Sequence, residues 1–164
     1  MFLSISPGGA HERAVQHALV RRAADIQFLR EHLSSNALEI ALFKLGMANS
    51  SDPHVRRFSK TALAAHLKDE NDSVKLAAME KIRIKMGIND SEDGANYKRV
   101  LRAVNTSNFD QVYLTTLQSI NQVFTMQNDD QIAMTANARF RNLATQDLDA
   151  QHGDLAAVKV FLGI

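Results

Sequence analysis

Residues 26–53 read IQFLREHLSSNALEIALFKLGMANSSDP, and this stretch decides the class of fold. Its apolar residues recur every three or four positions, which is the spacing of one helix face. These residues are Ile26, Leu29, Leu33, Ala37, Ile40, Phe43 and Met47. The pattern predicts a long helix that ends near residue 49 and reaches back to about residue 10. Asp52 followed by Pro53 predicts an N-cap with proline in the first turn, so a second helix begins directly after the first.

The same spacing predicts further helices along the rest of the chain. The second helix is expected to continue to about residue 86, where Gly87 and a polar stretch end it. A short helix is expected over residues 97–104. Ser107-Asn108-Phe109-Asp110 has the form of a capping box, which predicts the start of a third long helix. Asp129-Asp130 predicts the break before a fourth long helix, which runs to the C-terminus.

The composition and the connections between these helices favour a helical bundle. The chain has 164 residues, enough for one domain over residues 1–164, and its 7 glycines and 2 prolines argue against a many-turned β-fold. Two of the connections are short and force antiparallel neighbours, whereas roughly twenty residues separate the second and third long helices. We therefore predict an all-α, ferritin-like four-helix bundle. Its long connection crosses the bundle and contains the short helix.

Charge and residue content exclude several classes of partner and site. Lys and Arg total 19 against 18 for Asp and Glu, so the net charge of +1 predicts no nucleic-acid partner. Zero cysteines exclude disulfides, thiolate metal sites and a thiol nucleophile. No apolar run reaches the ~18 residues of a membrane span. Residues 1–9 lack the basic and apolar regions of an export signal, which predicts a cytoplasmic protein; the alternative is a periplasmic or exported protein whose signal has been removed.

Ionisable residues interrupt the apolar pattern of three predicted helices. Glu39 stands beside two apolar residues of the first helix, and His66 and Asp69 lie where the pattern of the second helix is interrupted. In the fourth helix, His152 is spaced to share a face with two leucines, and Asp149 precedes it by three residues. Counting along a crossover bundle places His66 and His152 at nearly the same level. The sequence thus predicts a polar band across the core.

Two interpretations of this polar band remain open. Four-helix di-iron proteins need a Glu from each of two helices and a Glu-x-x-His from each of the other two, and only Asp149-x-x-His152 approaches that pattern. One divalent ion such as Fe, Mn or Zn could still bind, with Glu39, His66, Asp149 and His152 as its first ligands. The other interpretation is a hydrogen-bonded polar core, because a buried histidine usually finds a carbonyl, hydroxyl or carboxylate partner. The incomplete ligand pattern favours the second interpretation.

The chain shows no motif of a known catalytic chemistry. It contains neither a Gly-x-x-x-x-Gly-Lys phosphate loop nor a Gly-x-Ser-x-Gly nucleophile elbow. We therefore predict no catalytic and no cofactor-binding residue, and favour a non-catalytic protein that acts through binding or assembly. Its partner would be a second copy or another protein. The alternative function is that of a metal-binding oxidase or metal store.

Each predicted long helix contains a short motif. The first has Phe28-Leu29 with Glu39-Ile40, and the second has Val55-x-x-Phe58 with His66, Asn71 and Leu76-Ala77. The third begins with Phe109-Asp110-x-x-Tyr113, and the fourth contains Leu148-x-x-x-His152. Over residues 24–158 the chain resembles a bacterial domain-of-unknown-function family of ferritin-like bundles, often described as outer-membrane or exported proteins. The resemblance implies a stress-related or envelope-related setting and no established reaction. A crossover bundle would bring Asp110 and Tyr113, two residues of these motifs, to the polar band, and we expect them to surround it together with Asp69. The chain departs from the family pattern at Ala65, where an acid is usual, and at Asn121, where a histidine is usual.

Overall fold

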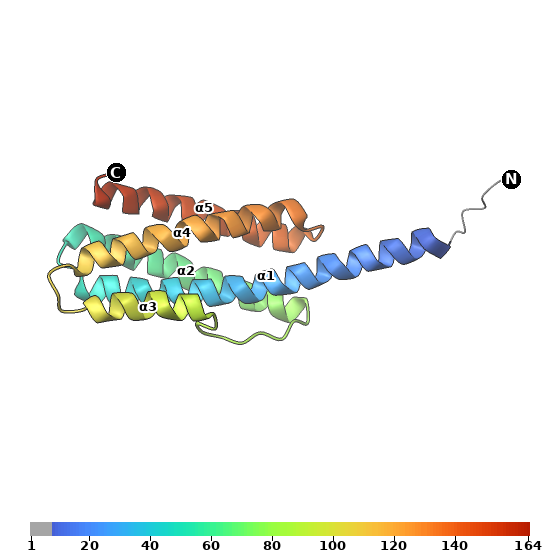
Figure 1. Cartoon of the computed structure of the whole chain (residues 1–164), viewed down its shortest axis with the longest axis horizontal. Coiled ribbons are helices and arrows are strands. Elements are labelled where there is room, and N and C mark those ends of the chain that lie inside the picture. The colour runs from blue at the N-terminus through green and yellow to red at the C-terminus, as the bar shows by residue number, and fades with distance from the viewer. Residues whose placement is uncertain (1–7) are drawn as a thin grey trace.

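The protein is an all-helical bundle in a computed structural model that describes residues 8–164. Residues 1–7, where the sequence predicts no export signal, lie outside the described part. The helices are α1 (Gly8–Asn49), α2 (Pro53–Met79), α3 (Ser91–Ala103), α4 (Phe109–Met134) and α5 (Ala138–Leu162). Figure 1 shows α1, α2, α4 and α5 as the four long helices, with the shorter α3 lying along the side of the bundle.

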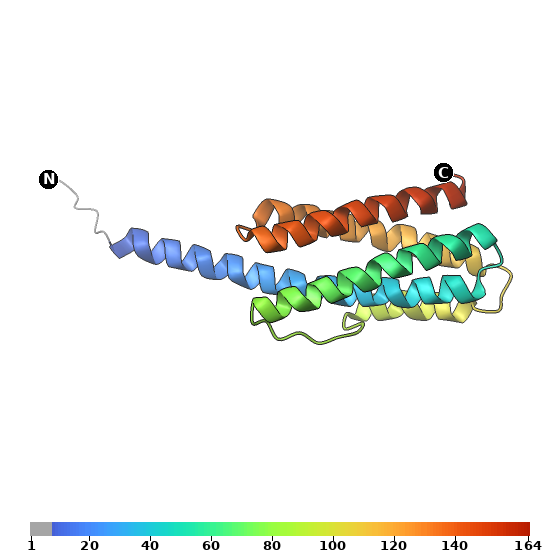
Figure 2. The same ribbon diagram turned by 180° about the vertical axis from the view of Figure 1, so that it is seen from behind.

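The connection between α2 and α4 crosses the bundle, as predicted. Short turns make α1 antiparallel to α2 and α4 antiparallel to α5, whereas α2 and α4 run in the same direction (Figures 1 and 2). The chain returns along α3, so that α4 begins beside the α1–α2 turn. There the backbone N–H of Ser51 donates to Asp110 Oδ2 at 3.1 Å. The predicted four-helix bundle with a short helix in its long connection is confirmed.

Two helix boundaries in the first half of the chain follow local capping chemistry. Asp52 caps α2 as predicted, because its Oδ1 accepts from the backbone N–H of His54 at 2.7 Å. The predicted end of α2 near residue 86 is wrong: the helix ends at Met79, and Lys81 then adopts a positive φ of 55°. The short helix begins earlier than predicted, at Ser91, because Asp90 accepts from the backbone N–H groups of the first turn.

Two capping predictions in the second half of the chain are also wrong. The expected capping box does not form, since Asn108 is the N-cap of α4 and makes no capping bond through its side chain. Asp129 and Asp130 lie exposed inside α4, because an exposed acid lowers helix stability only slightly. The break comes later, where Asn137 caps α5 by accepting from the backbone N–H of Arg139 at 3.0 Å.

The buried apolar side chains form two separate clusters along the bundle. One lies toward the α1–α2 turn and centres on Leu42, Phe43 and Leu117. The other lies toward the opposite end and includes Leu29 and Phe140. Along α1, α2 and α5, buried polar residues stand between the two clusters. The polar band predicted from the sequence therefore exists as a layer across the middle of the bundle.

The first part of α1 extends beyond the other helices (Figures 1 and 2). We call residues 8–21 the arm. At its base, Arg22 donates to Glu80 Oε2 at 2.6 Å and to the Glu80 carbonyl at 2.5 Å. Arg139 also donates to Glu80, at 3.1 Å, so one carboxylate joins α1 to the start of α5. Among residues 8–164, no helix combines the length and apolar character needed to cross a membrane.

Candidate functional site: a polar layer in the bundle core

Buried polar side chains from all four long helices form the layer between the apolar clusters. Within each helix they are spaced by three, four or seven residues, which places them on one inward face. The layer consists of His32, Asn36 and Glu39 from α1, His66, Asp69 and Ser73 from α2, Asn121 and Asn128 from α4, and Asp147, Gln151 and Asp154 from α5. Most of these side chains are buried, and Asp69 and Asp154 are partly exposed.

His32, Asp69 and Asp147 form the first of two ionisable clusters, which we call the His32 cluster. His32 Nε2 lies 2.8 Å from Asp69 Oδ2 and 3.1 Å from the Ser73 hydroxyl. His32 Nδ1 lies 3.4 Å from Asp147 Oδ2, which also accepts from the Asn128 amide at 2.6 Å. A carboxylate thus faces each nitrogen of this imidazole.

Glu39, His66 and Asp154 form the second cluster, which we call the His66 cluster. His66 Nε2 lies 3.0 Å from Asp154 Oδ2, and Nδ1 lies 3.4 Å from Glu39 Oε2 and 2.7 Å from the Asn36 side-chain oxygen. Glu39 Oε2 accepts from the Gln151 amide at 2.8 Å. His66 and Glu39 are only 2% and 1% exposed, so this imidazole and carboxylate meet almost entirely away from water.

The two clusters repeat one arrangement at two levels of the bundle. Each combines one histidine with two carboxylates, and each takes one residue from α1, one from α2 and one from α5. On α1 and on α5 the two contributing residues are seven positions apart, which is two helical turns or about 10 Å. The histidine comes from α1 in one cluster and from α2 in the other. The layer therefore joins the same three helices twice.

Burial and the neighbouring carboxylates act in opposite directions on His32. Burial alone lowers the pKa of its imidazole, but Asp147 and Asp69 raise that pKa by more than burial lowers it. The pKa of His32 therefore lies well above the usual value of 6.5. Burial tends to raise the pKa of Asp147, yet His32 and Asn128 hold it below its ordinary value. The His32 cluster consequently contains an imidazolium between carboxylates at neutral pH.

In the His66 cluster, the pKa values of both Glu39 and His66 are raised. Burial raises the pKa of Glu39 to about 8, although the His66 imidazolium opposes this shift. Burial lowers the pKa of His66, but the carboxyl groups of Glu39 and Asp154 outweigh it and raise that pKa to about 9. Burial thus favours the neutral form of Glu39, and the two neighbouring carboxyl groups favour the protonated form of His66.

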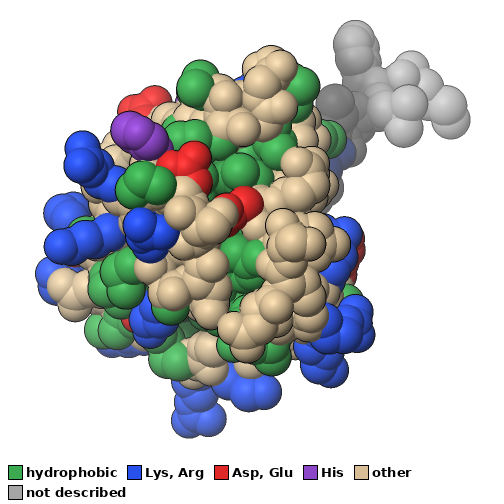
Figure 3. Space-filling model, turned by 90° about the vertical axis from the view of Figure 1, so that its left-hand side faces the viewer, with side chains coloured by type: hydrophobic (Ala, Val, Ile, Leu, Met, Phe, Trp, Pro, Cys, Tyr) green, Lys and Arg blue, Asp and Glu red, His purple; other side chains and the backbone are tan. Residues whose placement is uncertain are grey.

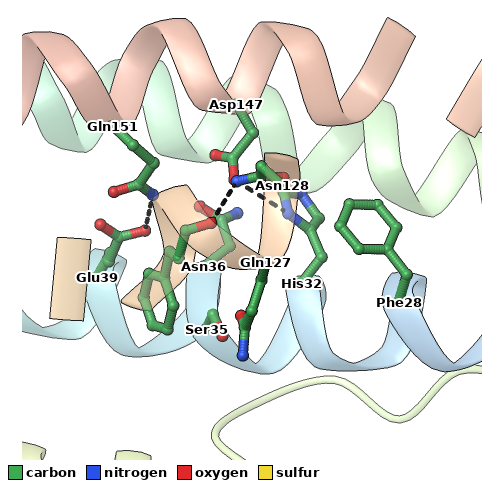
Figure 4. A pocket seen from close by; sticks show the side chains of 10 residues that line it. Phe28, His32, Ser35, Asn36, Glu39, Gln127, Asn128, Asp147 and Gln151 are labelled. Carbon is green, nitrogen blue, oxygen red and sulfur yellow. Dashed lines mark hydrogen bonds and ion pairs between the residues drawn. The ribbon is translucent and has the colours of Figure 1, made fainter. Parts of the chain in front are cut away.

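Figure 4 shows a small cavity between α1, α4 and α5, where Glu39 points toward Gln151 and Asp147 toward Asn128 and His32. Its volume is about 10 Å³, the size of a single water molecule. Three buried oxygens of residues that line it, Glu39 Oε1, Asn128 Oδ1 and Gln151 Oε1, have no hydrogen-bond partner among the described residues. The amide nitrogens of Asn128 and Gln151 already donate to carboxylates, so turning either amide would not satisfy these oxygens.

The structure brings together some of the residues predicted for the site and leaves others apart. Glu39 and His66 meet in the His66 cluster, and Asp69 joins the His32 cluster. Asp149 and His152 do not reach either cluster and are exposed, which corrects the expected inward face of the fourth helix. Its inward face is instead marked by Phe140, Leu143, Ala144, Asp147, Gln151 and Val158. The expectation took Leu148 and Leu155 as core residues, but both are only partly buried.

The other two residues expected around the band lie closer to the α1–α2 turn. Asp110 accepts from the Ser51 hydroxyl at 2.7 Å, so it fastens the start of α4 to the α1–α2 turn. The Tyr113 hydroxyl lies 2.8 Å from the Ser59 hydroxyl in the apolar cluster. Burial raises the pKa of Tyr113 well above its ordinary value, so this hydroxyl stays protonated. Both residues hold the fold together at that end.

The residues predicted for the site did not include His32, although it lies one heptad before Glu39, nor did they include Asp147, Gln151 and Asp154. A signal for His32 was present: Asp25, His32 and Glu39 recur every seven residues on one helix face. Asp25 is buried like the other two and accepts from the Gln131 amide at 2.7 Å. On α5 the residues Asp147 and Asp154 show the same interval. A search for polar residues at heptad spacing would have found this inward face.

The donor set does not fit the two-metal site of ferritin-like oxidases. That site needs carboxylates from all four long helices, whereas α4 contributes the amides of Asn121 and Asn128 to the layer. Each cluster nevertheless offers one imidazole nitrogen and two carboxylate oxygens that lie within 4.8 Å of one another. A set of this kind has the composition of a site for a single divalent ion.

Comparisons with known proteins support the fold and the family. The structure is similar to the crystal structure of a DUF305 fragment from Deinococcus radiodurans, with a TM-score of 0.74 and 13% sequence identity. The similarity covers 85% of this chain and 95% of that one, and at this identity it shows the fold alone. No curated protein matches the sequence. A family profile described as a domain of unknown function, DUF4142, matches residues 10–160, so the chain belongs to the DUF4142 family.

Proposed function

We propose that this protein acts without catalysis, by assembling with a second copy of itself through the arm. The observation that carries the proposal is a stripe of apolar residues on α1 that continues from the packed core onto the uncovered arm. Leu33 and Leu29 of this stripe are buried in the bundle. Val15 and Leu19 continue it on the arm, where their side chains are 44% and 58% exposed.

The spacing of this stripe is the spacing of a helix that packs against another helix. Its positions 15, 19, 22, 26, 29 and 33 alternate steps of four and three residues, as in a coiled-coil seam. Arg22 is the one charged residue of this seam, and it pairs with Glu80 at the base of the arm. Within the bundle the other helices cover this seam. Along the arm nothing in residues 8–164 covers it (Figures 1 and 2). An uncovered helix about as long as the arm is only marginally stable in water, and a partner would supply the missing packing.

A second copy is the partner whose shape and charge fit best. Beside the arm lies an open groove of about 500 Å³ that the arm forms with the end of α4, and Val20, Ala133 and Met134 supply its apolar side chains. The arm carries Arg13 and Arg21, and the nearby end of α4 carries the exposed Asp129 and Asp130. Two arms that lie antiparallel would each bring Arg13 toward Asp129 and Asp130 of the other copy, which makes a symmetric interface.

The cavity inside the polar layer is too small for an organic substrate. The polar cavity of the core measures about 10 Å³, whereas sites for small molecules usually measure roughly 300–1,000 Å³.

The end of the molecule away from the arm also differs from the arm. Figure 3 shows Lys and Arg side chains spread around its edge with apolar side chains between them. The arm is thus the better candidate for a surface that binds.

The proposal is tested by the mass of the protein in solution. Light scattering after size exclusion should give a dimer for the protein as it is, with dissociation on dilution. Leu19→Glu places a charge in the exposed seam and should give a monomer in which any loss of helical content is confined to the arm. Val160→Glu is the matched control, because Val160 is 77% exposed on α5 and lies outside the seam. It should leave the dimer intact.

Two results would overturn this proposal. One is a strict monomer at about 100 μM, well above the Kd of ordinary homodimers. The other is a dimer that Leu19→Glu does not weaken. The stress-related or envelope-related setting that the family resemblance implies stays a prediction, as does the compartment in which the protein works.

A further inference from the structure

We infer that Glu39, His66 and Asp154 form a binding site for one divalent cation of the Mn²⁺, Fe²⁺ or Zn²⁺ class. This inference concerns the core and is independent of the arm. One imidazole nitrogen with two carboxylate oxygens is a ligand set that suits these borderline and hard ions. Two carboxylates also balance the charge of a dication, so the occupied site would be neutral inside the bundle.

The ligand atoms are already close to the positions that an ion requires. One atom from each of the three residues lies within 4.8 Å of the other two. Ligands bound to one ion at about 2.1 Å lie roughly 3–4 Å apart, so binding needs only small side-chain movements. Glu39, His66 and Asp154 project from α1, α2 and α5, and these helices fix the three ligands from different sides.

An unpartnered carboxylate oxygen is the second observation that points to a ligand. Glu39 is 1% exposed, and its Oε1 has no hydrogen-bond partner although Oε2 accepts from Gln151. The Gln151 side-chain oxygen, which lines the same small cavity, is also unpartnered. A buried acceptor without a donor is unfavourable. A cation beside Glu39 would displace the protons that Glu39 and one His66 nitrogen hold and would satisfy the carboxylate oxygen. The amide oxygen of Gln151 could become an additional ligand.

The His66 cluster is a better cation site than the His32 cluster because one of its buried carboxylate oxygens has no hydrogen-bond partner. In the His32 cluster, Asp147 Oδ2 accepts from Asn128, and His32 Nε2 contacts both Asp69 and Ser73. No carboxylate oxygen of that cluster is both buried and unpartnered. The His32 cluster is therefore complete as an ion-paired network, and it provides an internal comparison for the experiment.

An ion can reach the His66 cluster from the surface. An open groove of about 190 Å³ lies between α2 and α5, and His66 is among the residues that line it. The Asp154 side chain is 15% exposed, so one ligand of the site already contacts water. Asp69 and Asp147 of the His32 cluster also line this groove, together with Asp72, which pairs with Lys68 and Lys75.

The test uses Mn²⁺, because its paramagnetic resonance signal in solution disappears when the ion binds. After chelator treatment, titration of the full chain should show one bound Mn²⁺ per chain. Glu39→Gln and Asp154→Asn keep the size of each side chain and should weaken binding at least tenfold. Asp149→Asn and His152→Gln are matched controls on α5, since both residues are exposed, and they should change affinity by less than twofold.

A measurement on the unaltered protein keeps the inference testable if a variant fails to fold. Bound Mn²⁺ broadens the NMR signals of nearby nuclei, so the signals of His66 and Gln151 should broaden before those of the arm. Absence of binding at millimolar Mn²⁺ would overturn the inference. Equal loss of binding in His152→Gln, or loss in His32→Gln without loss in Glu39→Gln, would overturn it as well. Repeating the titration on monomeric Leu19→Glu separates this site from the proposed assembly.

Discussion

His32 of α1 and Asp147 of α5 face each other across the bundle core, with Nδ1 3.4 Å from Oδ2. The other imidazole nitrogen lies 2.8 Å from Asp69 Oδ2 of α2. This one side chain therefore links three helices that are far apart in the sequence. A protonated imidazole can donate to both carboxylates, whereas a neutral imidazole can donate to only one of them. The stability of the bundle should consequently depend on the charge of His32.

We predict that the free energy of unfolding decreases above pH 6.5 because of His32. Its pKa in the folded protein is raised well above 6.5, so the folded state binds this proton more tightly than the unfolded state. The contribution is complete below pH 6.5 and is lost as the pH rises through the raised pKa. The slope from this one group is at most about 1.4 kcal/mol per pH unit. Urea unfolding at several pH values between 6 and 9 measures it.

The variant His32→Gln isolates this contribution from that of His66, which titrates in the same direction. It should be less stable at pH 6 and should have a shallower pH slope than the unaltered protein. The exposed His54→Gln is the control and should leave the slope unchanged. If His32→Gln keeps the full slope, the His32 cluster does not hold its proton as described.

Gly46 of α1 is expected to tolerate no side chain. A Cβ atom at this position would overlap the Tyr113 ring and hydroxyl and the Ser59 hydroxyl. Gly46→Ala should therefore lower the free energy of unfolding by about 1–3 kcal/mol, as other overpacked cores do. Gly153→Ala, in the exposed part of α5 with no atom near its added methyl group, should raise it by up to about 1 kcal/mol through helix propensity. Thermal or urea unfolding of both variants distinguishes these effects, and equal stabilisation of the two would contradict the close contact.

The two N-caps at the α1–α2 turn end of the bundle should respond differently to alanine. Asp52 accepts from a backbone N–H of α2, so Asp52→Ala should lower the free energy of unfolding by about 1 kcal/mol. Asn108 makes no such bond to α4, and Asn108→Ala should change stability by less than about 0.5 kcal/mol. Denaturant unfolding of the two variants side by side checks this difference. A larger loss from Asn108→Ala would show that its side chain does cap α4.

Asn121 is a buried amide whose replacement should stabilise the fold. Its side chain is fully buried, and neither its oxygen nor its nitrogen has a partner. Asn121→Leu removes this unsatisfied amide and should raise the free energy of unfolding by about 1–3 kcal/mol. Asn128→Leu is the contrast on the same helix, because Asn128 donates to Asp147 and to the Phe124 carbonyl, and its loss should be destabilising. A calorimetric melt that ranks the two variants in the opposite order would refute this account.

Much of the fold could be predicted from the sequence because its signals are local. The spacing of apolar residues over 26–49 identifies α1, and Asp52-Pro53 identifies the start of α2. Loop lengths then favour the crossover, since only a long connection lets α2 and α4 run in parallel. The helix ends were less predictable: an acidic pair such as Asp129-Asp130 can either cap a helix or lie within one. Which of these occurs depends on contacts that the local sequence does not contain.

The sequence by itself determined an all-α bundle with ionisable residues at core positions, and it identified Glu39 and His66 among them. Only the tertiary structure decided which residues meet these two. On α5, a rotation of the helix face by one or two residues replaces Asp149 and His152 with Asp147, Gln151 and Asp154. Periodicity cannot fix that rotation when polar residues occupy the inward face, because the apolar pattern then no longer marks it. The rotation is set by packing against α1, α2 and α4, where each buried charge must find a partner.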